Sequence, residues 1–315
     1  MASGLRARAS CRYSVSVTGK ATKPKRHHFI PQMMLRHFAD DDGRLWFWRR
    51  DFPPGEARNT STANLFVEKD LYTYVRGDGS KDTALEEFFA QMEGAGAVFI
   101  NSLARIVRAG QVPVLTDAAW DFWCRFYFYY LKRTPGAIAA YREAFDFEPM
   151  LDAAMVKVKH ELRANGGDEI DPDLGRIMLR NAEVVAQSVP PSPELLEQFK
   201  EMGLAVVRIQ AKRKSFIIGD VPGAEAPFLR PDGTKSPPML FLPLTWDIAV
   251  ALIGGGRRVE VGTVDRDQVR TMNVATAARA MTIAGRAEEL VNSLATGAPY
   301  SGVVIDRRTR ENGAA

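Results

Sequence analysis

Apolar side chains recur at helical spacing through the middle of the chain and again near its end. Threonine stands before two of these stripes, in Thr116-Asp117 and Thr134-Pro135, which is the usual way for a helix to begin. The spacing and the start signals together predict helices over residues 82–107, 117–133, 135–162, 173–187, 193–213 and 265–283. A break at Pro149 is an alternative for the third of these helices. The middle of the chain is therefore expected to be a bundle of helices.

Short β-type runs flank the helical part. In residues 44–49, RLWFWR, the side chains alternate between two faces, and a second extended run surrounds residues 71–75. Residues 224–238 are rich in proline and glycine and are expected to form an irregular loop, while the glycine run 254–256 is interpreted as a hairpin turn. Further short strands are expected over residues 239–244, 248–253 and 258–263.

This pattern predicts an α+β fold that is predominantly α-helical, with an N-terminal β-hairpin, a central helical bundle, a C-terminal small β-sheet and a closing helix. The chain has 315 residues, of which 46% are hydrophobic and 25% charged, a balance that excludes a disordered or coiled-coil protein. Linker-like stretches are short. We therefore expect a disordered basic tail over 1–24, a single domain over 25–290 and a flexible C-terminal segment over 291–315.

The formal net charge of +4 is concentrated at the N-terminus. Residues 1–26 hold seven basic side chains and no acidic one, and removing these seven charges from +4 leaves −3 on the rest of the chain. By net charge the body is thus not a basic nucleic-acid binder, and any nucleic-acid contact is expected from the tail. The tail is interpreted as a solvated leader, with an organelle transit peptide as the alternative.

The two cysteines, Cys11 and Cys124, have the spacing of neither a zinc site nor a redox pair. A reducing cytosol is therefore the expected, cytoplasmic, location. No stretch of 18 apolar residues lacks charges, so no membrane span is expected. The aromatic run over 121–131 is too short to cross a bilayer and is interpreted as a buried core helix.

A motif of adjacent histidines opens the expected domain. His27-His28-Phe29-Ile30-Pro31-Gln32, followed by Leu35-Arg36 and Phe38, resembles the start of a bacterial family catalogued as domain of unknown function 4238. Three later stretches resemble that family in the same order, namely Arg133-Thr134-Pro135, the run FIIGDVP over 216–222, and Asn273. Gly219 and Gly223 depart from its pattern, which has Ser before Asp220 and Val after Pro222. The resemblance covers about residues 25–285. It implies the fold and the boundaries, and no activity.

The two histidines are the sharpest candidates for chemistry. Side chains of adjacent residues in an extended chain point to opposite sides, so His27 or His28 could serve as a ligand or general base while the other orients it. His37 could also approach them across a turn. In the alternative interpretation one histidine caps the following helix and hydrogen-bonds backbone groups, while the other is exposed. The opening also resembles the start of the His-Asn-His nuclease motif. The later His of that motif is missing, and Glu86, Glu87 and Glu93 stand in the following helix instead.

Three further charged residues are candidates at distant points of the chain. Glu93 shares a helix face with Glu86 and precedes four small residues that would let another segment approach. Arg133 could hold a phosphate or carboxylate, or form a buried ion pair at a helix end. Asp220 could ligate a metal or hydrogen-bond within a turn, and Asn273 could line the same pocket.

Two functions remain open on this evidence. In the first, which we favour, the protein is a non-catalytic binding or interaction protein, and the polar residues hold its parts together. In the alternative it is a metal-assisted hydrolase of phosphoesters, such as a nuclease. His27, His28 and Arg133 would then be catalytic, and His28, Glu93 and Asp220 would hold a divalent metal. Convergence of these side chains within roughly 4–6 Å in a cleft would favour the enzyme.

Overall fold

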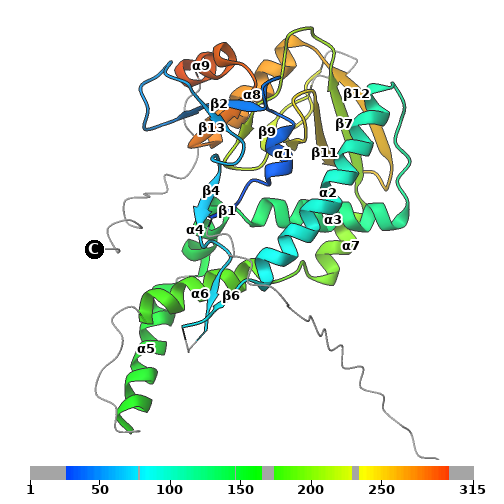
Figure 1. Cartoon of the computed structure of the whole chain (residues 1–315). Coiled ribbons are helices and arrows are strands. Elements are labelled where there is room, and N and C mark those ends of the chain that lie inside the picture. Colours follow the sequence, from blue (N-terminus) through cyan, green and yellow to red (C-terminus); the bar gives the residue numbers. More distant parts are fainter. Residues whose placement is uncertain (1–25, 77–78, 146, 165–173, 229–233, 298–315) are drawn as a thin grey trace, which may run out of the picture.

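The computed structural model describes residues 26–76, 79–145, 147–164, 174–228 and 234–297 (Figure 1). The basic tail, with the nucleic-acid contact expected of it, lies outside these residues. In the described part four sheets stand beside the helices, and the largest has five strands. The expectation of a dominant helical bundle with only a small sheet is therefore wrong, although the mixture of helices and strands is present.

The helices of the middle of the chain follow the predicted positions closely. Thr116 caps its helix as expected, because its hydroxyl accepts a hydrogen bond from the backbone N–H of Ala119 at 3.2 Å. The predicted helix over 135–162 is divided in two, and the one over 193–213 ends much earlier. The described helices are α1 (Gln32–Arg36), α2 (Ala84–Arg108), α3 (Asp117–Lys132), α4 (Pro135–Phe145), α5 (Phe147–Ala164), α6 (Leu174–Ser188), α7 (Pro193–Glu201), α8 (Arg266–Arg279) and α9 (Glu288–Gly297).

Two small ladders and two larger sheets contain the strands. The ladders pair β1 (Arg26–His28) with β4 (Val67–Lys69) and β5 (Tyr74–Val75) with β6 (Lys81–Asp82), both antiparallel. The five-stranded sheet has the order β12 (Val259–Val264), β7 (Gly203–Ile209), β11 (Ile248–Ile253), β10 (Met239–Pro243) and β9 (Ala224–Ala226). The four-stranded sheet has the order β3 (Arg58–Ser61), β2 (Arg44–Arg49), β13 (Thr282–Gly285) and β8 (Ile218–Gly219).

Strand β7 explains most of the error in the fold prediction. Its sequence, GLAVVRI, was assigned to the end of a helix, yet it forms an inner strand between β11 and β12. Leu204 and Val206 are fully buried there, so tertiary packing overrides the helical continuation of the pattern. Because β12 pairs with β7 in parallel, the glycine run 254–256 carries the chain across the end of β7. It is not the hairpin turn expected from the sequence.

The four-stranded sheet joins the two ends of the described chain. An N-terminal hairpin is present, but β2 pairs with β3 and not with the second expected run, part of which forms β5 and pairs with β6. Strand β13 adds to this hairpin from the C-terminal side, with Trp46 opposite Gly285. The closing helix ends at Arg279 so that β13 can form. Part of the segment expected to be flexible belongs to α9, where Val291 and Leu294 are buried. The division into a tail and a single domain stays a prediction.

Helix packing places four of the candidate residues where α2, α3 and the β1–β4 ladder meet, namely His27, His28, Glu93 and Arg133. Gly96 on α2 allows the close approach of α3, since a Cβ atom at this position would lie 2.7 Å from the ring of Phe126. Figure 1 shows the two larger sheets in the upper half of the molecule and α4, α5 and α6 in the lower half. None of the helices in the described ranges is both long and apolar enough to cross a membrane.

Candidate functional site

Strand β1 presents the two histidines to opposite sides of its ladder. His27 lies opposite Glu68 and is 3% exposed, whereas His28 lies opposite Val67 and is partly exposed. This follows from the two-residue period of a strand. The backbone N–H of Phe29 continues the pairing by donating to the carbonyl of Phe66 at 3.0 Å.

Both ring nitrogens of His27 face groups of the protein. Nδ1 accepts a hydrogen bond from the backbone N–H of Tyr72 at 2.9 Å, and the two rings are stacked with centroids 5.4 Å apart. An accepting Nδ1 requires the neutral ring to carry its proton on Nε2. Nε2 lies 3.1 Å from Oε2 of Glu86 on α2. Neither nitrogen of His27 is therefore open to a metal ion or a substrate.

The guanidinium of Arg133, at the C-terminal cap of α3, is buried and held on several sides. Nη2 donates to the carbonyl of His28 at 2.6 Å and lies 2.8 Å from Oε1 of Glu93. Nε donates to the hydroxyl of Tyr72 at 3.1 Å, and the group lies 4.4 Å from the ring centroid of Phe89. Burial alone would lower the pKa of Arg133, but Tyr72 and Glu93 raise it above its ordinary value. Arg133 is thus a permanent cation that the protein itself neutralises.

Tyr72 links the two halves of this arrangement. Burial raises its pKa to about 12, so its hydroxyl stays protonated near neutral pH. The hydroxyl lies within hydrogen-bond distance of two carbonyl oxygens, that of Arg133 at 3.2 Å and that of His28 at 3.3 Å. We call the connected set the polar core cluster. Its members are His27, His28, Tyr72, Glu86, Glu93 and Arg133.

His28 is the member of the polar core cluster with an open ring nitrogen. Its Nε2 lies 3.1 Å from the carbonyl oxygen of Thr62, which can only accept, so Nε2 carries the proton. Nδ1 forms no hydrogen bond with any residue that the structure describes. Burial lowers the pKa of His28 below its ordinary value, although the bond to Thr62 and the charge of Glu93 act in the opposite direction. The ring is therefore neutral near pH 7.

Asp220 does not lie in the polar core cluster. It follows β8 in the four-stranded sheet, where its Oδ1 accepts from the backbone N–H of Met281 at 3.0 Å and its own N–H donates to Thr282. These contacts hold the segment after β8 against β13. The structure thus does not gather the expected metal ligands His28, Glu93 and Asp220. Within the described ranges, no three His, Cys, Asp or Glu side chains are grouped in a way that could hold a metal ion.

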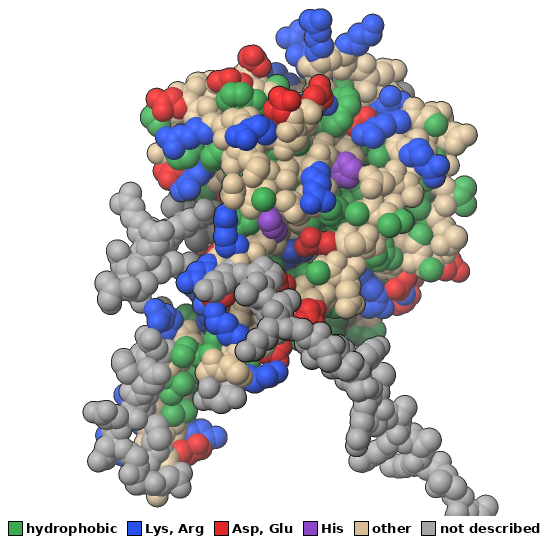
Figure 2. Space-filling view, viewed as in Figure 1, with side chains coloured by type: hydrophobic (Ala, Val, Ile, Leu, Met, Phe, Trp, Pro, Cys, Tyr) green, Lys and Arg blue, Asp and Glu red, His purple; other side chains and the backbone are tan. Residues whose placement is uncertain are grey.

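Two other residues from the sequence analysis have separate positions. Asn273 on α8 accepts from the N–H of Ile217 at 3.1 Å and donates to the carbonyl of Ser215 at 2.9 Å, so it binds backbone. His37 lies beside the ion pair of Arg108 and Asp247, and burial followed by the charge of Arg108 lowers its pKa. Figure 2 shows two histidine side chains at the surface of one face, bordered by charged and apolar groups.

The histidine motif lies at the start of a region that matches a family model. The family model described as "Protein of unknown function (DUF4238)" matches residues 26–286. The chain belongs to this family. No curated protein and no solved structure matches the chain. The match begins at β1, so the strand that carries both histidines opens the DUF4238 region.

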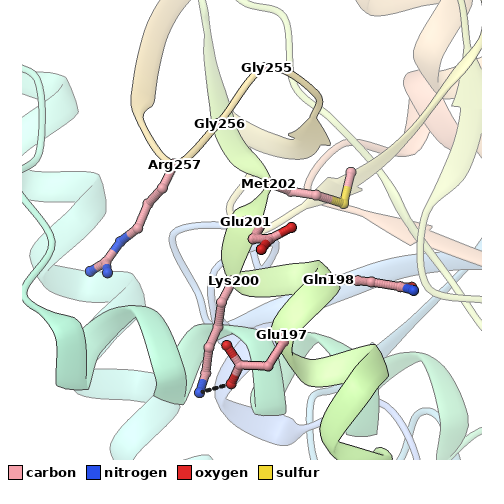
Figure 3. Close-up of a pocket in the computed structure, with 8 residues that line it drawn as sticks. All are labelled: Glu197, Gln198, Lys200, Glu201, Met202, Gly255, Gly256 and Arg257. Atoms are coloured by element: carbon pink, nitrogen blue, oxygen red, sulfur yellow. Dashed lines mark hydrogen bonds and ion pairs between the residues drawn. The ribbon is translucent and has the colours of Figure 1, made fainter.

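One hollow on the described surface of this DUF4238 protein is broad and shallow. It has a volume of about 840 Å³ and lies between α7 and the glycine turn that follows β11. Figure 3 shows Lys200 and Glu197 pointing toward one another, while Arg257 points away from Met202 and Gln198. Its cations are already paired, Lys200 with Asp121 and Glu197, and Arg257 with Asp117 at 2.7 Å. It therefore offers no unpaired cation to an anionic ligand.

A second hollow was missed by the sequence analysis. It has a volume of about 300 Å³ and lies between α8, α9 and residues 213–215, with four cationic side chains on its wall. They are Arg213, Lys214, Arg266 and Arg270. A signal was present, because Lys212-Arg213-Lys214 is a basic run and Arg266 and Arg270 are spaced to share one helix face. The fold brings these two groups together across a distance in sequence that no local pattern could bridge.

Proposed function

We propose that this DUF4238 protein is a non-catalytic binding protein in which the polar core cluster belongs to the scaffold. The observation that supports this most directly is the engagement of His27. A histidine that acts as a base or a metal ligand needs an unshared pair of electrons directed at its target. In His27 that pair accepts a backbone hydrogen bond from Tyr72.

The position of Arg133 supports the same proposal. An arginine that clamps an anionic substrate must present part of its guanidinium to the ligand. Arg133 is 4% exposed and directs its donors at Glu93, Tyr72 and the carbonyl of His28. Because it bonds to the backbone of β1, it attaches a three-residue strand to the end of α3. Such a short strand gains few ladder hydrogen bonds of its own.

The alternative, a metal-assisted hydrolase of phosphoesters such as a nuclease, would depend on what the polar core cluster leaves open. These groups are Nδ1 of His28 and the carboxylate of Glu93, whose side chain is 23% exposed. A neutral imidazole beside a carboxylate is a suitable general base or half of a metal site. The third ligand that this alternative requires, Asp220, has its contacts in another sheet.

Hydrolysis and unfolding measured on the same proteins test the proposal. The parent, His28→Ala and the control His37→Ala are incubated with single- and double-stranded nucleic acid in the presence of Mg²⁺, Mn²⁺ or Zn²⁺. His37 is a matched control because it is also a partly buried histidine with a lowered pKa. We expect no turnover by any of the three. His28→Ala should lose about 1–2 kcal/mol of stability, since it loses one hydrogen bond and some buried contact area.

The opposite result would be equally clear. Metal-dependent turnover by the parent and by His37→Ala, abolished in a His28→Ala variant of unchanged stability, would contradict the scaffold role and establish the hydrolase.

We further propose that the protein works in the cytosol. Cys124 is a free and buried thiol, and burial raises its pKa to about 11. A thiol in that state is protonated and unreactive, so it suits a compartment in which structural disulfides are not formed.

A further inference from the structure

The smaller hollow carries an excess of unneutralised positive charge. Arg213, Lys214, Arg266 and Arg270 lie on its wall, and none of them forms an ion pair or a side-chain hydrogen bond with any residue that the structure describes. This contrasts with the larger hollow, in which Lys200 pairs with two carboxylates. We call the smaller hollow the cationic cleft.

The acidic residues nearby do not cancel this charge. Glu289 also borders the cationic cleft but pairs with none of its four cations, nor with any other residue in the described ranges. Asp265 caps α8 by accepting a hydrogen bond from the N–H of Gln268 at 2.9 Å. The attraction for an anion therefore comes from the cationic side chains and not from the N-terminus of the helix. Like charges on one face of a helix repel, and Arg266 and Arg270 stand one turn apart. A bound anion would relieve that repulsion.

The two halves of the cationic cleft are fixed to each other. Asn273 on α8 bonds to the carbonyl of Ser215 and the N–H of Ile217, so it fastens the segment that carries Arg213 and Lys214 to the helix that carries the other two cations. Arg213 has φ of 59°, a left-handed conformation that is uncommon for a residue with a side chain. The cationic side chains therefore project from a preorganised frame.

The remaining wall of the cleft is apolar. Val269 and Leu294 are buried beneath it, and Leu290 is partly exposed beside them. A volume of about 300 Å³ is at the lower end of the usual range for small-molecule sites. Cations on one side and apolar side chains on the other suit a ligand that has a phosphate group at one end and an uncharged part at the other.

We propose that the cationic cleft binds the phosphate group of a small phosphorylated ligand of nucleotide size. This deepens the proposed binding function and rests on it. A hollow of this size bordered by four cations suits a compact ligand better than a nucleic-acid backbone, which is followed by a long basic stripe. Arginine pairs favour phosphate because their planar groups can form two hydrogen bonds to it at once.

Isothermal titration calorimetry of the full chain with ADP and with pyrophosphate tests the proposal. We expect one bound ligand per chain and weaker binding as NaCl is raised. The two probes show which part of the ligand is recognised. Equal affinity for ADP and pyrophosphate means that the phosphates alone are bound, whereas tighter binding of ADP means that the apolar wall also contacts the ligand. Both results support the cleft as a phosphate site.

Charge-removing variants locate the binding. Arg266→Gln combined with Arg270→Gln should weaken the affinity for pyrophosphate by about tenfold or more, because charge-assisted hydrogen bonds are lost. Arg213→Gln combined with Lys214→Gln should act in the same direction from the other wall. The matched controls are Arg279→Gln, on the last turn of α8, and Lys212→Gln; neither residue lines the cleft, and both variants should bind like the parent. Unchanged melting temperatures show that the cleft variants are folded.

Three results would overturn the proposal. One is a parent that gives no heat with either probe, and another is a pair of double variants that bind like the parent. The third is a 20-nucleotide single strand that binds the parent and is not displaced by pyrophosphate. All three leave the hydrolysis assay of His28→Ala unaffected. Conversely, nucleic-acid hydrolysis that depends on His28 would contradict the proposed binding function. The affinities of the cleft variants for pyrophosphate would still show whether the cationic cleft binds anions.

Discussion

Replacement of Arg133 by methionine is the most direct perturbation of the scaffold. Methionine keeps much of the apolar stem of the side chain, but it removes the guanidinium, which lies over the ring of Phe89, and with it every donor. The carbonyl of His28, the hydroxyl of Tyr72 and the carboxylate of Glu93 each lose a partner. Breaking a buried ion pair from one side costs about 3–5 kcal/mol, because the remaining charge stays desolvated. The side chain of Glu93 is 23% exposed and can recruit water, so we expect a value of about 3 kcal/mol.

Arg125 supplies a matched control on the same helix. It pairs with Asp121 one turn away, and the two side chains are 45% and 37% exposed. Exposed pairs of this spacing contribute about 0.3–0.5 kcal/mol, so Arg125→Met should be nearly neutral. Arg133→Lys should fall between the parent and Arg133→Met, because lysine keeps the charge but lacks the planar group that reaches three partners at once.

Urea unfolding of the four proteins, followed by tryptophan fluorescence and by circular dichroism, measures these differences. A lower midpoint at unchanged slope is a loss of stability, whereas a changed slope would indicate a different amount of surface exposed on unfolding. If Arg133→Met unfolds within about 0.5 kcal/mol of Arg125→Met, the buried guanidinium is not a structural tie and the argument from its contacts fails.

Three further predictions follow from the fold. Phe126→Ala should destabilise the protein by about 3–5 kcal/mol in the same urea assay, because the ring is 2% exposed and lies between α3 and α2; a mutant as stable as the parent would contradict this packing. Gly223→Ala should cost at least about 2 kcal/mol, since φ is 71° and the new Cβ would meet a backbone carbonyl oxygen of β10 at 2.5 Å, and an unchanged melting temperature would refute it. Stability should fall as the pH is lowered from about 7 to about 5, because burial lowers the pKa of His28 and of His37 and the unfolded chain then binds more protons in that range. The double variant His28→Gln, His37→Gln should show a weaker dependence, and a dependence equal to that of the parent would exclude these two groups as its source.

Local sequence patterns correctly predicted the helices and strands whose buried face matches the spacing of their apolar residues. The amphipathic stripe of α2 and the alternation in β2 are examples, and β2 has the predicted bounds. The same reasoning failed for β7, where an apolar run directly after a helix reads equally well as its continuation. It also missed β13, because the helical pattern of 265–283 contains no local sign that the chain must return to β2. Sheets assembled from distant segments are decided by tertiary contacts that spacing alone does not encode.

The candidate site was predictable to the extent that one motif carried it. The histidine motif and Arg133 were predicted as candidates, and the structure places them side by side. A sequence motif alone does not distinguish residues that act on a ligand from residues that bind each other. Glu86 was named for sharing a helix face with Glu93 and was not a candidate site residue, yet its carboxylate lies beside His27. Asp220 was included because carboxylates that follow strands often have functions, but turn residues of this kind also bind backbone, as this one does.

The short length of β1 explains how its two adjacent histidines are used. A strand of three residues has few ladder bonds and would fray unless other contacts held it. Its two faces are held differently. On the inner face, His27 is fixed through its own ring by Tyr72 and Glu86. His28 is held mainly through its main chain, because Arg133 donates a hydrogen bond to its carbonyl. Its imidazole lies on the other face and keeps Nδ1 open. One histidine is therefore committed to the fold. Its neighbour is the only ring of the polar core cluster from which a different function could still develop.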